Sequence, residues 1–181
     1  MKKNTACAGK LNLESVIRSA GGLLRTRANC RIGIERESLR CTFSGHLSEA
    51  AHPSSLGKKD DHPFFTADWA ESQIELKTPP CESSMACHHF LETLTNIALQ
   101  EMSSRHELLW PLSTPCILPD ADRILCASFE KTSENVRRQN LRAKYPLEML
   151  LLSGIHYNFS FDDEFLRKIA DGGDVRTVRE N

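Results

Sequence analysis

The run Ile34-Glu35-Arg36-Glu37 constrains the fold most, because it places two acids two residues apart in a segment that reads as a β-strand. Successive side chains of a strand point to opposite faces, so Glu35 and Glu37 leave from the same face. Their carboxylates repel one another at close range. A solvated strand face tolerates that repulsion, and for an isolated pair of acids such a face is the ordinary explanation.

Two later segments carry an acid or an imidazole in a similar setting. The run 67–75 contains Asp68 and Glu75, and the apolar run 153–160 contains His156. Each acid alone carries little weight, since acids are common. A lone His in an apolar strand is more often a hydrogen-bonded core residue than a metal ligand.

The joint pattern is more informative than its parts. Four carboxylates and one imidazole on inward faces of strands are costly to bury unless a divalent cation compensates their charge. Mg²⁺ prefers oxygen ligands and is commonly bound by carboxylates together with substrate phosphates. An imidazole can complete such a site, although it suits Mn²⁺ or Zn²⁺ slightly better. The pattern therefore predicts an enzyme that acts on a metal-bound nucleotide.

Size and charge set the class of protein. The chain has 181 residues and a formal net charge of −1, which suits one globular domain and gives no bulk attraction to nucleic acid or anionic membranes. Four basic residues between positions 137 and 144 read as a solvated helix face. Because no apolar run is long enough for a signal peptide or a membrane span, we expect a cytoplasmic protein.

The seven cysteines are odd in number and irregularly spaced, which favours free thiols in a reducing compartment over a disulfide framework. Cys81, Cys87, His88 and His89 lie close together in the sequence. A typical zinc site needs a second pair of ligands, which this segment lacks, and 87–89 falls within a helical pattern. The sequence therefore argues against zinc here.

Hydrophobic periodicity predicts helices at 12–26, from Ser83 or Ser84 to 109, and at 129–145, and a short helix opened by Asp162. It predicts a strand that begins at 32–34 and returns or extends through 39–43, and further strands at 64–77 and 149–161. Between these elements, 44–63 is predicted to be a loop and 110–127 a Pro-rich connection. This order predicts an α+β protein with an antiparallel sheet. The sequence contains no Gly-rich dinucleotide or P-loop motif.

Four runs, 33–40, 67–79, 109–116 and 152–160, resemble the bacterial glutamate–cysteine ligase (γ-glutamylcysteine synthetase) family, including the ligase half of bifunctional glutathione synthesis enzymes. The order and approximate spacing of all four runs agree. The resemblance implies a partial glutamine-synthetase-like antiparallel sheet, a half funnel, with helices packed outside. It divides the chain into an N-terminal segment, 1–19, and the N-terminal part of a ligase catalytic domain, 20–181.

The resemblance also implies an activity. Such ligases use ATP to phosphorylate the γ-carboxylate of L-glutamate, and the amine of L-cysteine then displaces phosphate from the γ-glutamyl phosphate. This is the first step of glutathione synthesis. The implied cofactor is Mg²⁺, or alternatively Mn²⁺, with ATP as co-substrate.

Individual residues match the family's functional positions, although the sequence assigns no catalytic residue with certainty. The positions of the family's metal ligands are occupied by Glu35, Glu37, Asp68, Glu75 and His156. Positions near the amino-acid substrates are occupied by Trp69, Thr78, Arg138, Leu141, Ser153 and Asn158. A turn or strand-end hydrogen bond explains Thr78 and Ser153 equally well.

The chain departs from the family in three respects. Arg137 stands where some bacterial members have Tyr, and Leu150 stands where Gln is expected. The resemblance implies that both positions touch the cysteine pocket, so the sequence leaves the thiol-substrate specificity open. Family members are also considerably longer, and the additional part carries further metal and ATP ligands and several strands. We therefore expect the front part of a ligase, poorly stable and weakly active by itself.

Two alternatives remain open at this point. One is a non-catalytic metal-binding fragment or split subunit that needs a separate C-terminal ligase chain. The other is a two-metal phosphohydrolase, which would release phosphate without any dependence on cysteine.

Overall fold

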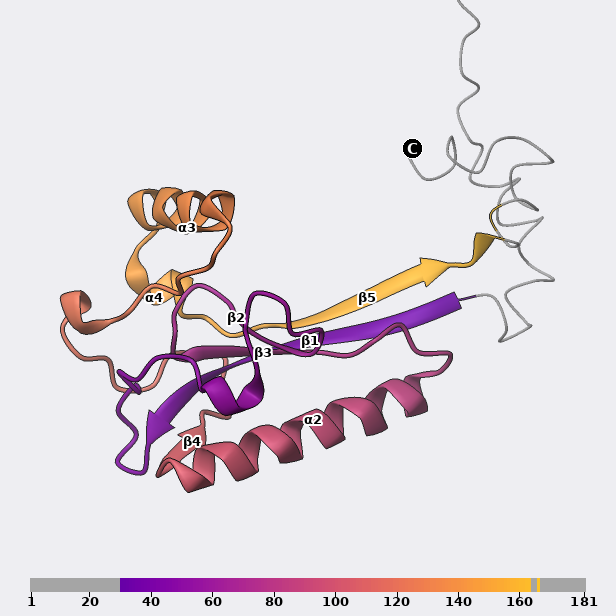
Figure 1. Cartoon of the computed structure of the whole chain (residues 1–181), viewed down its shortest axis with the longest axis horizontal. Helices are drawn as coiled ribbons and strands as arrows, with labels where there is room; N and C mark the ends of the chain where they lie inside the picture. The colour runs from indigo at the N-terminus through magenta and orange to yellow at the C-terminus, as the bar shows by residue number, and fades with distance from the viewer. Residues whose placement is uncertain (1–29, 164–165, 167–181) are drawn as a thin grey trace, which may run out of the picture. The chain divides into compact units, whose positions relative to one another are not determined.

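The computed structural model describes residues 30–163 and 166 (Figure 1). The helix expected at 12–26 lies outside these residues. Of the helix expected after Asp162, the structure describes only the beginning, where the Leu166 N–H donates to the Asp162 carbonyl at 3.1 Å. Residues 32–158 form one compact unit, and this unit contains the whole candidate site.

The described strands are β1 (Cys30–Thr42), β2 (Phe65–Ala67), β3 (Gln73–Lys77), β4 (Glu107–Leu109) and β5 (Ile155–Phe161). Strand β3 pairs antiparallel with both β1 and β2, and β4 pairs antiparallel with the last residues of β1. Strand β5 also pairs with β1. The described strands make an open antiparallel sheet with helices beside it, which confirms the predicted α+β class.

The longest described helix, α2 (Ser84–Ser104), begins where the sequence predicts, because the Ser83 side chain accepts the Ala86 N–H at 3.1 Å. The prediction that this helix runs to residue 109 is wrong. His106 takes a left-handed backbone conformation (φ 59°), and the chain then reverses into β4. The apolar residues of β4 continue a helical spacing in the sequence, so the pattern alone could not mark the helix end. Among the described helices, none combines the length and apolar character that crossing a membrane requires.

Three other predicted boundaries need correction. The segment 64–77 is two strands joined by a turn, in which the Asp68 N–H donates to the Gln73 carbonyl at 2.9 Å. The segment 149–161 is not one strand, because a short helix, α4 (Leu147–Leu150), follows Pro146 and β5 begins only at residue 155. The helix predicted at 129–145 is α3 (Thr132–Lys144).

The remaining long segments contain short 3-10 turns. The loop predicted at 44–63 includes η1 (Ser54–Leu56), and the Pro-rich connection at 110–127 includes η2 (Ala121–Arg123). Of the two alternatives for 39–43, extension of the first strand is correct, because β1 continues to Thr42.

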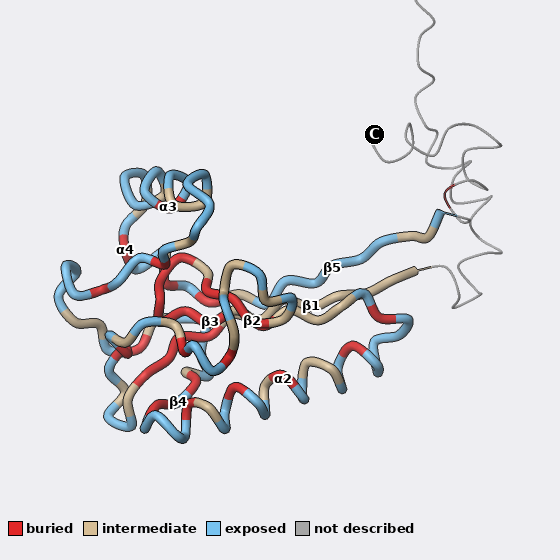
Figure 2. Tube along the Cα trace, in the orientation of Figure 1, coloured by how far each residue is buried: buried red, intermediate tan, exposed pale blue. Residues whose placement is uncertain are grey.

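Two apolar clusters lie on opposite faces of the sheet. Alternation along β3 directs Ile74 and Leu76 toward α2, whose buried stripe includes Leu94, Ala98 and Met102. The other cluster joins the end of β1 to Trp69 and to the region around α4; its buried members are Leu39, Cys41, Leu47, Trp69, Ala70, Cys116, Ile124, Leu147 and Leu151. Buried positions accordingly recur along α2 and gather in β2, β3 and the last residues of β1, whereas β5 is mostly exposed (Figure 2).

The cap of α2 allows a direct test. Replacement of Ser83 by alanine is expected to lower the free energy of unfolding by about 1 kcal/mol, because the Ala86 N–H loses its acceptor. Replacement of the neighbouring exposed Ser84 is the control, since no side-chain hydrogen bond of that residue is seen. Denaturant unfolding of both variants measures the difference, and an equal loss in the two would contradict the capping role.

Candidate active site

One face of the sheet gathers the predicted acids, because the strand register places them on the same side. Glu37 lies opposite Glu75 and Glu35 lies opposite Lys77 in the β1–β3 ladder. Thr66 of β2 lies opposite Glu75 on its other side. This face is turned away from Ile74 and Leu76, which pack with α2. Two acids directly opposite each other on neighbouring strands are unfavourable by themselves, so the arrangement is a candidate for function.

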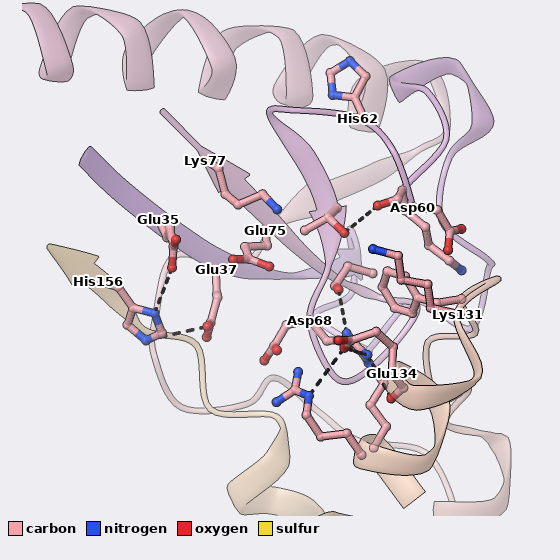
Figure 3. Close-up of a pocket in the computed structure, with 16 residues that line it drawn as sticks. Glu35, Glu37, Asp60, His62, Asp68, Glu75, Lys77, Lys131, Glu134 and His156 are labelled. Atoms are coloured by element: carbon pink, nitrogen blue, oxygen red, sulfur yellow. Dashed lines mark hydrogen bonds and ion pairs between the residues drawn. The ribbon is translucent and has the colours of Figure 1, made fainter. Parts of the chain in front are cut away.

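These side chains line a cavity of about 430 Å³ (Figure 3). All five predicted metal ligands and the predicted substrate residue Arg138 line it. The cavity also has basic lining residues, namely Lys59, Lys77, Lys131, Arg137 and Arg138. Figure 3 shows the four predicted acids, His156 and Lys77 on one side, and Lys131 on the other side together with the acids Asp60 and Glu134. The end formed by the four predicted acids and His156 attracts cations, while the opposite side mixes basic and acidic groups.

His156 of β5 lies between the two acids of β1. Its Nδ1 is 3.4 Å from Glu35 Oε2, and its Nε2 is 3.8 Å from Glu37 Oε1. Glu37 is the most enclosed of the three side chains, at 10% exposure against 34% for Glu35 and 57% for His156. The Gly154 N–H donates to Glu37 Oε2 at 2.8 Å, which fixes the position of this carboxylate.

Burial disfavours the ionised forms of three carboxyl groups at the acidic end of the cavity. Burial, followed by the neighbouring charges of Asp68 and Glu35, raises the pKa of Glu37 despite the Gly154 hydrogen bond. Burial also raises the pKa of Asp68, against the opposing effect of Arg138, and burial raises the pKa of Glu75. Raised carboxyl pKa values mean that the ionised forms are disfavoured until positive charge arrives. A divalent cation would supply that charge.

The donor types fit Mg²⁺, which takes carboxylate oxygens and keeps room for water and phosphate. Within residues 30–163 and 166, however, no three His, Cys, Asp or Glu side chains stand close enough together to hold a metal ion. The five predicted ligands therefore share one cavity without forming an assembled coordination shell. Their chemistry supports a cation site, and the assignment of each as a ligand remains a prediction.

The other predicted substrate residues do not line the cavity. Trp69 and Leu141 belong to the apolar cluster beside α4. Thr78 accepts the Ile34 N–H at 2.9 Å, as the strand-end explanation expected. Ser153 is buried, and Asn158 is exposed on β5. These five residues lie outside the lining of the cavity, and their assignment to the substrate site remains a prediction.

Several lining residues were not identified from the sequence. Lys59, Asp60 and His62 come from residues 57–62, within the segment 44–63 that the sequence predicts as a loop. Gly57 takes a positive φ of 92°, and a Cβ there would lie 2.6 Å from the His62 ring, so glycine is needed to bring this loop against the cavity. Phe129 and Glu134 come from the start of the α3 region. Only long-range contacts bring these segments to the sheet.

A network of buried polar groups around Glu71 holds the loop 57–62 beside the cavity. Glu71 pairs with Lys59 and accepts the N–H groups of Ser128 at 2.9 Å and His52 at 3.0 Å. Although burial alone would raise it, these partners together lower the pKa of Glu71. Burial, with the positive charges of Arg40 and Lys59, lowers the pKa of His52 to about 4. The network thus favours ionised Glu71 and neutral His52.

His52 predicts a pH dependence of stability. Because the folded state lowers its pKa, the unfolded chain takes up the proton first, so the stabilisation is complete above about pH 6.5 and is lost as the pH falls toward 4. We expect a loss of up to about 3 kcal/mol across that window, and a flatter curve for His52→Phe. His89→Gln, at an exposed position of α2, is the control. Denaturant unfolding at several pH values measures this, and identical slopes for wild type and His52→Phe would contradict it.

The cysteines lie apart from this chemistry. The six described cysteines are free thiols, and none of them lines the cavity. Cys81 and Cys87 are buried at the junction of β3 and α2, while His88 and His89 are exposed.

Comparison with known proteins gives a consistent result. A family model described as glutamate–cysteine ligase matches residues 21–180. The chain is similar to the glutamate–cysteine ligase of Clostridium acetobutylicum, at 41% identity over 74% of this chain and 28% of that protein. It is also similar to a bifunctional glutathione biosynthesis protein of Clostridium perfringens, at 36% identity over 75% of this chain and 17% of that protein.

Solved structures agree in fold. The glutamate–cysteine ligase of Francisella tularensis, determined in complex with AMP, superposes with a TM-score of 0.72 at 36% identity, over 80% of this chain and 29% of that one. The bifunctional glutathione synthetase of Pasteurella multocida gives a TM-score of 0.76 at 27% identity, over 91% of this chain and 21% of that one. The chain spans less than a third of the length of each of these four relatives. By the match of residues 21–180, this chain belongs to the glutamate–cysteine ligase family.

Proposed function

We propose that this chain forms part of an ATP-dependent glutamate–cysteine ligase, which joins the γ-carboxylate of L-glutamate to the amine of L-cysteine through a γ-glutamyl phosphate. The observation that carries the proposal is the shared cavity on one sheet face, where four carboxylates and an imidazole gather and Lys131 and Arg137 are among the other lining residues. Membership of the ligase family supports the choice of reaction. The AMP complex of the Francisella tularensis relative supports an adenine nucleotide as co-substrate.

Each end of the cavity has a role in this proposal. Glu35, Glu37, Asp68, Glu75 and His156 would hold Mg²⁺ or Mn²⁺. When bound, the cation would neutralise charge on the triphosphate and on the phosphoryl group in transfer. Lys131 and Arg137 would attract the anionic groups of the substrates, and the hydrogen bond from Gly154 keeps Glu37 in place before any ligand arrives.

The residues that flank the cavity have indirect roles in this proposal. Trp69 donates its indole N–H to the Arg138 carbonyl at 3.2 Å and so joins the turn before β3 to α3. Thr78 fixes the edge of β1 through Ile34. Leu141, Ser153 and Asn158 would shape the amino-acid pocket from its surroundings.

We further propose that the complete reaction centre includes a part of the ligase fold beyond this cavity. The relatives are more than three times as long as their matched segments. Among the described strands, β5 pairs only with β1, and its apolar Ile155 and Tyr157 are 72% and 60% exposed. An apolar strand with a free edge is suited to pairing with a further strand. The full chain by itself is therefore proposed to turn over weakly, and a separate C-terminal ligase fragment is its proposed partner.

The experiment measures ATP-dependent phosphate release with glutamate and cysteine. We expect little release from the full chain alone. Release should appear when the chain is joined to, or mixed with, the part of the Clostridium acetobutylicum ligase that follows its matched region. Omission of cysteine should suppress it strongly.

Each contrary result has a distinct meaning. Phosphate release that ignores cysteine would favour a phosphohydrolase. Divalent-cation binding with no release in any combination would favour a non-catalytic metal-binding fragment. Rapid turnover by the chain alone would contradict the need for a further part.

A further inference from the structure

We propose that Arg138 is a positioning residue that holds the Asp68 turn in place, and that it acts through Asp68 without contacting substrate. The inference rests on the proposed function, because the position of Asp68 matters if the acids of the cavity bind a cation. It changes the role that the family resemblance implies for Arg138, which is a position near the amino-acid substrates.

The hydrogen bonds of the guanidinium support this assignment. Arg138 Nε donates to the Asp68 carbonyl at 2.8 Å, and Nη2 donates to the Ala67 carbonyl at 3.4 Å. Nη1 donates to the carbonyl and to Oε2 of Glu134, at 3.2 and 3.0 Å. The residue is 4% exposed. A guanidinium has five N–H donors, so protein groups already occupy most of its hydrogen-bonding capacity.

Further contacts fix the orientation of this side chain. The Arg138 Cζ lies 4.1 Å from the centre of the Phe129 ring, which is a cation–π arrangement. The Lys59 Nζ lies 5.5 Å from the centre of the same ring. The backbone carbonyl of Arg138 also accepts the indole N–H of Trp69, the residue after Asp68. The turn is therefore held from α3 at three consecutive residues, 67, 68 and 69.

The consequence for the cavity follows from the chain path. Asp68 lies in the turn between β2 and β3, outside the regular ladder that fixes Glu75 on its strand. Its backbone depends on the turn hydrogen bond to Gln73 and on the bonds from Arg138. Arginine suits this task because its planar fork reaches two carbonyls at once, which a lysine ammonium on a flexible stem does not reproduce.

The test uses the full chain with Arg138→Lys, which keeps the charge and removes the fork. Amide hydrogen exchange at Asp68 and Gln73 should become at least about tenfold faster, while exchange in the β1–β3 ladder stays unchanged. Mn²⁺ affinity, measured by electron paramagnetic resonance of the free ion, should fall about tenfold, in the range seen when a residue that orients a metal ligand is lost. Arg142→Lys, exposed one turn further along α3, is the matched control.

A second variant protects the test against simple unfolding. Glu134→Gln leaves the Arg138 hydrogen bonds to the Ala67 and Asp68 carbonyls in place and removes its ion pair, so exchange at Asp68 should rise by only about threefold. Unchanged exchange at Asp68 in both variants overturns the positioning role. Faster exchange at Asp68 with unchanged Mn²⁺ affinity would show that the position of the turn does not affect cation binding, which overturns that part of the proposal.

Failure of the proposed function gives a different pattern. If the wild-type chain binds no Mn²⁺, the metal role of the acids fails, while the exchange measurement still decides whether Arg138 holds the turn. If Arg138→Lys changes only the KM for cysteine in the assembled ligase, with exchange and Mn²⁺ affinity unaltered, Arg138 contacts substrate and the positioning role is wrong.

Discussion

Replacement of Arg40 by leucine is expected to lower the free energy of unfolding by about 3–5 kcal/mol, a large part of the stability of a small domain. Arg40 is fully buried and pairs with the buried Glu107 of β4 at 2.7 Å. Its Nη2 also donates to the carbonyls of Ala50, Ala51 and Glu71, at 2.5, 3.0 and 3.1 Å. The substitution leaves a buried carboxylate and three carbonyls without this donor, which is the costly outcome.

Two further variants separate charge from packing. Because the penalty comes from an unpaired buried charge, the double variant Arg40→Leu/Glu107→Leu should recover part of the loss. Arg36, four residues earlier on β1, makes one long hydrogen bond to Thr95 at 3.4 Å, and its replacement should cost about 1 kcal/mol or less. Denaturant unfolding measures all three variants. A loss below about 1 kcal/mol for Arg40→Leu would contradict the anchoring role of this pair.

Replacement of Glu37 by glutamine is expected to reduce the activity of the assembled ligase by about 100- to 1000-fold, the range for loss of one group that stabilises charge in a transition state. The substitution keeps the shape of the side chain, and its amide oxygen can still accept the Gly154 N–H. It removes the negative charge that the proposed cation needs. Because burial raises the pKa of Glu37, the loss of that charge should not lower the melting temperature.

The matched control for this substitution is Glu130→Gln. Glu130 pairs with Lys58 at the surface, where both side chains are well exposed, and it does not line the cavity. Its replacement should leave activity and melting temperature nearly unchanged. Steady-state kinetics of the assembled enzyme compare the two variants. Equal activities for Glu37→Gln and wild type would show that Glu37 has no role in the proposed active site.

The acids on regular strands could be predicted from the sequence, while the wall that faces them could not. A period of two places Glu35 and Glu37 on one face, and the register confirms that Glu75 shares it. Asp68 enters the cavity for another reason, because it lies in a turn that interrupts what reads as one strand. The family resemblance drew attention to it where the periodicity did not.

Long-range contacts explain what the pattern missed. Arg40 sits in β1 among residues that read as an ordinary strand, and only its pairing with Glu107 shows that its charge is buried. The same contact lies next to the boundary between α2 and β4, which the sequence placed wrongly. Lys59, Phe129 and Glu134 come from a loop and a helix start far from the acids in sequence. Their place in the cavity depends on tertiary packing, which local periodicity does not encode.

The proposed function requires that the acidic end of the cavity binds a divalent cation. The most direct measurement is a Mn²⁺ titration of the full chain, followed by electron paramagnetic resonance, for wild type and for the triple variant Glu35→Gln/Glu37→Gln/Glu75→Gln. We expect saturable Mn²⁺ binding by the wild type and its loss in the triple variant, while Glu130→Gln still binds. Equal Mn²⁺ binding by the wild type and the triple variant would contradict it.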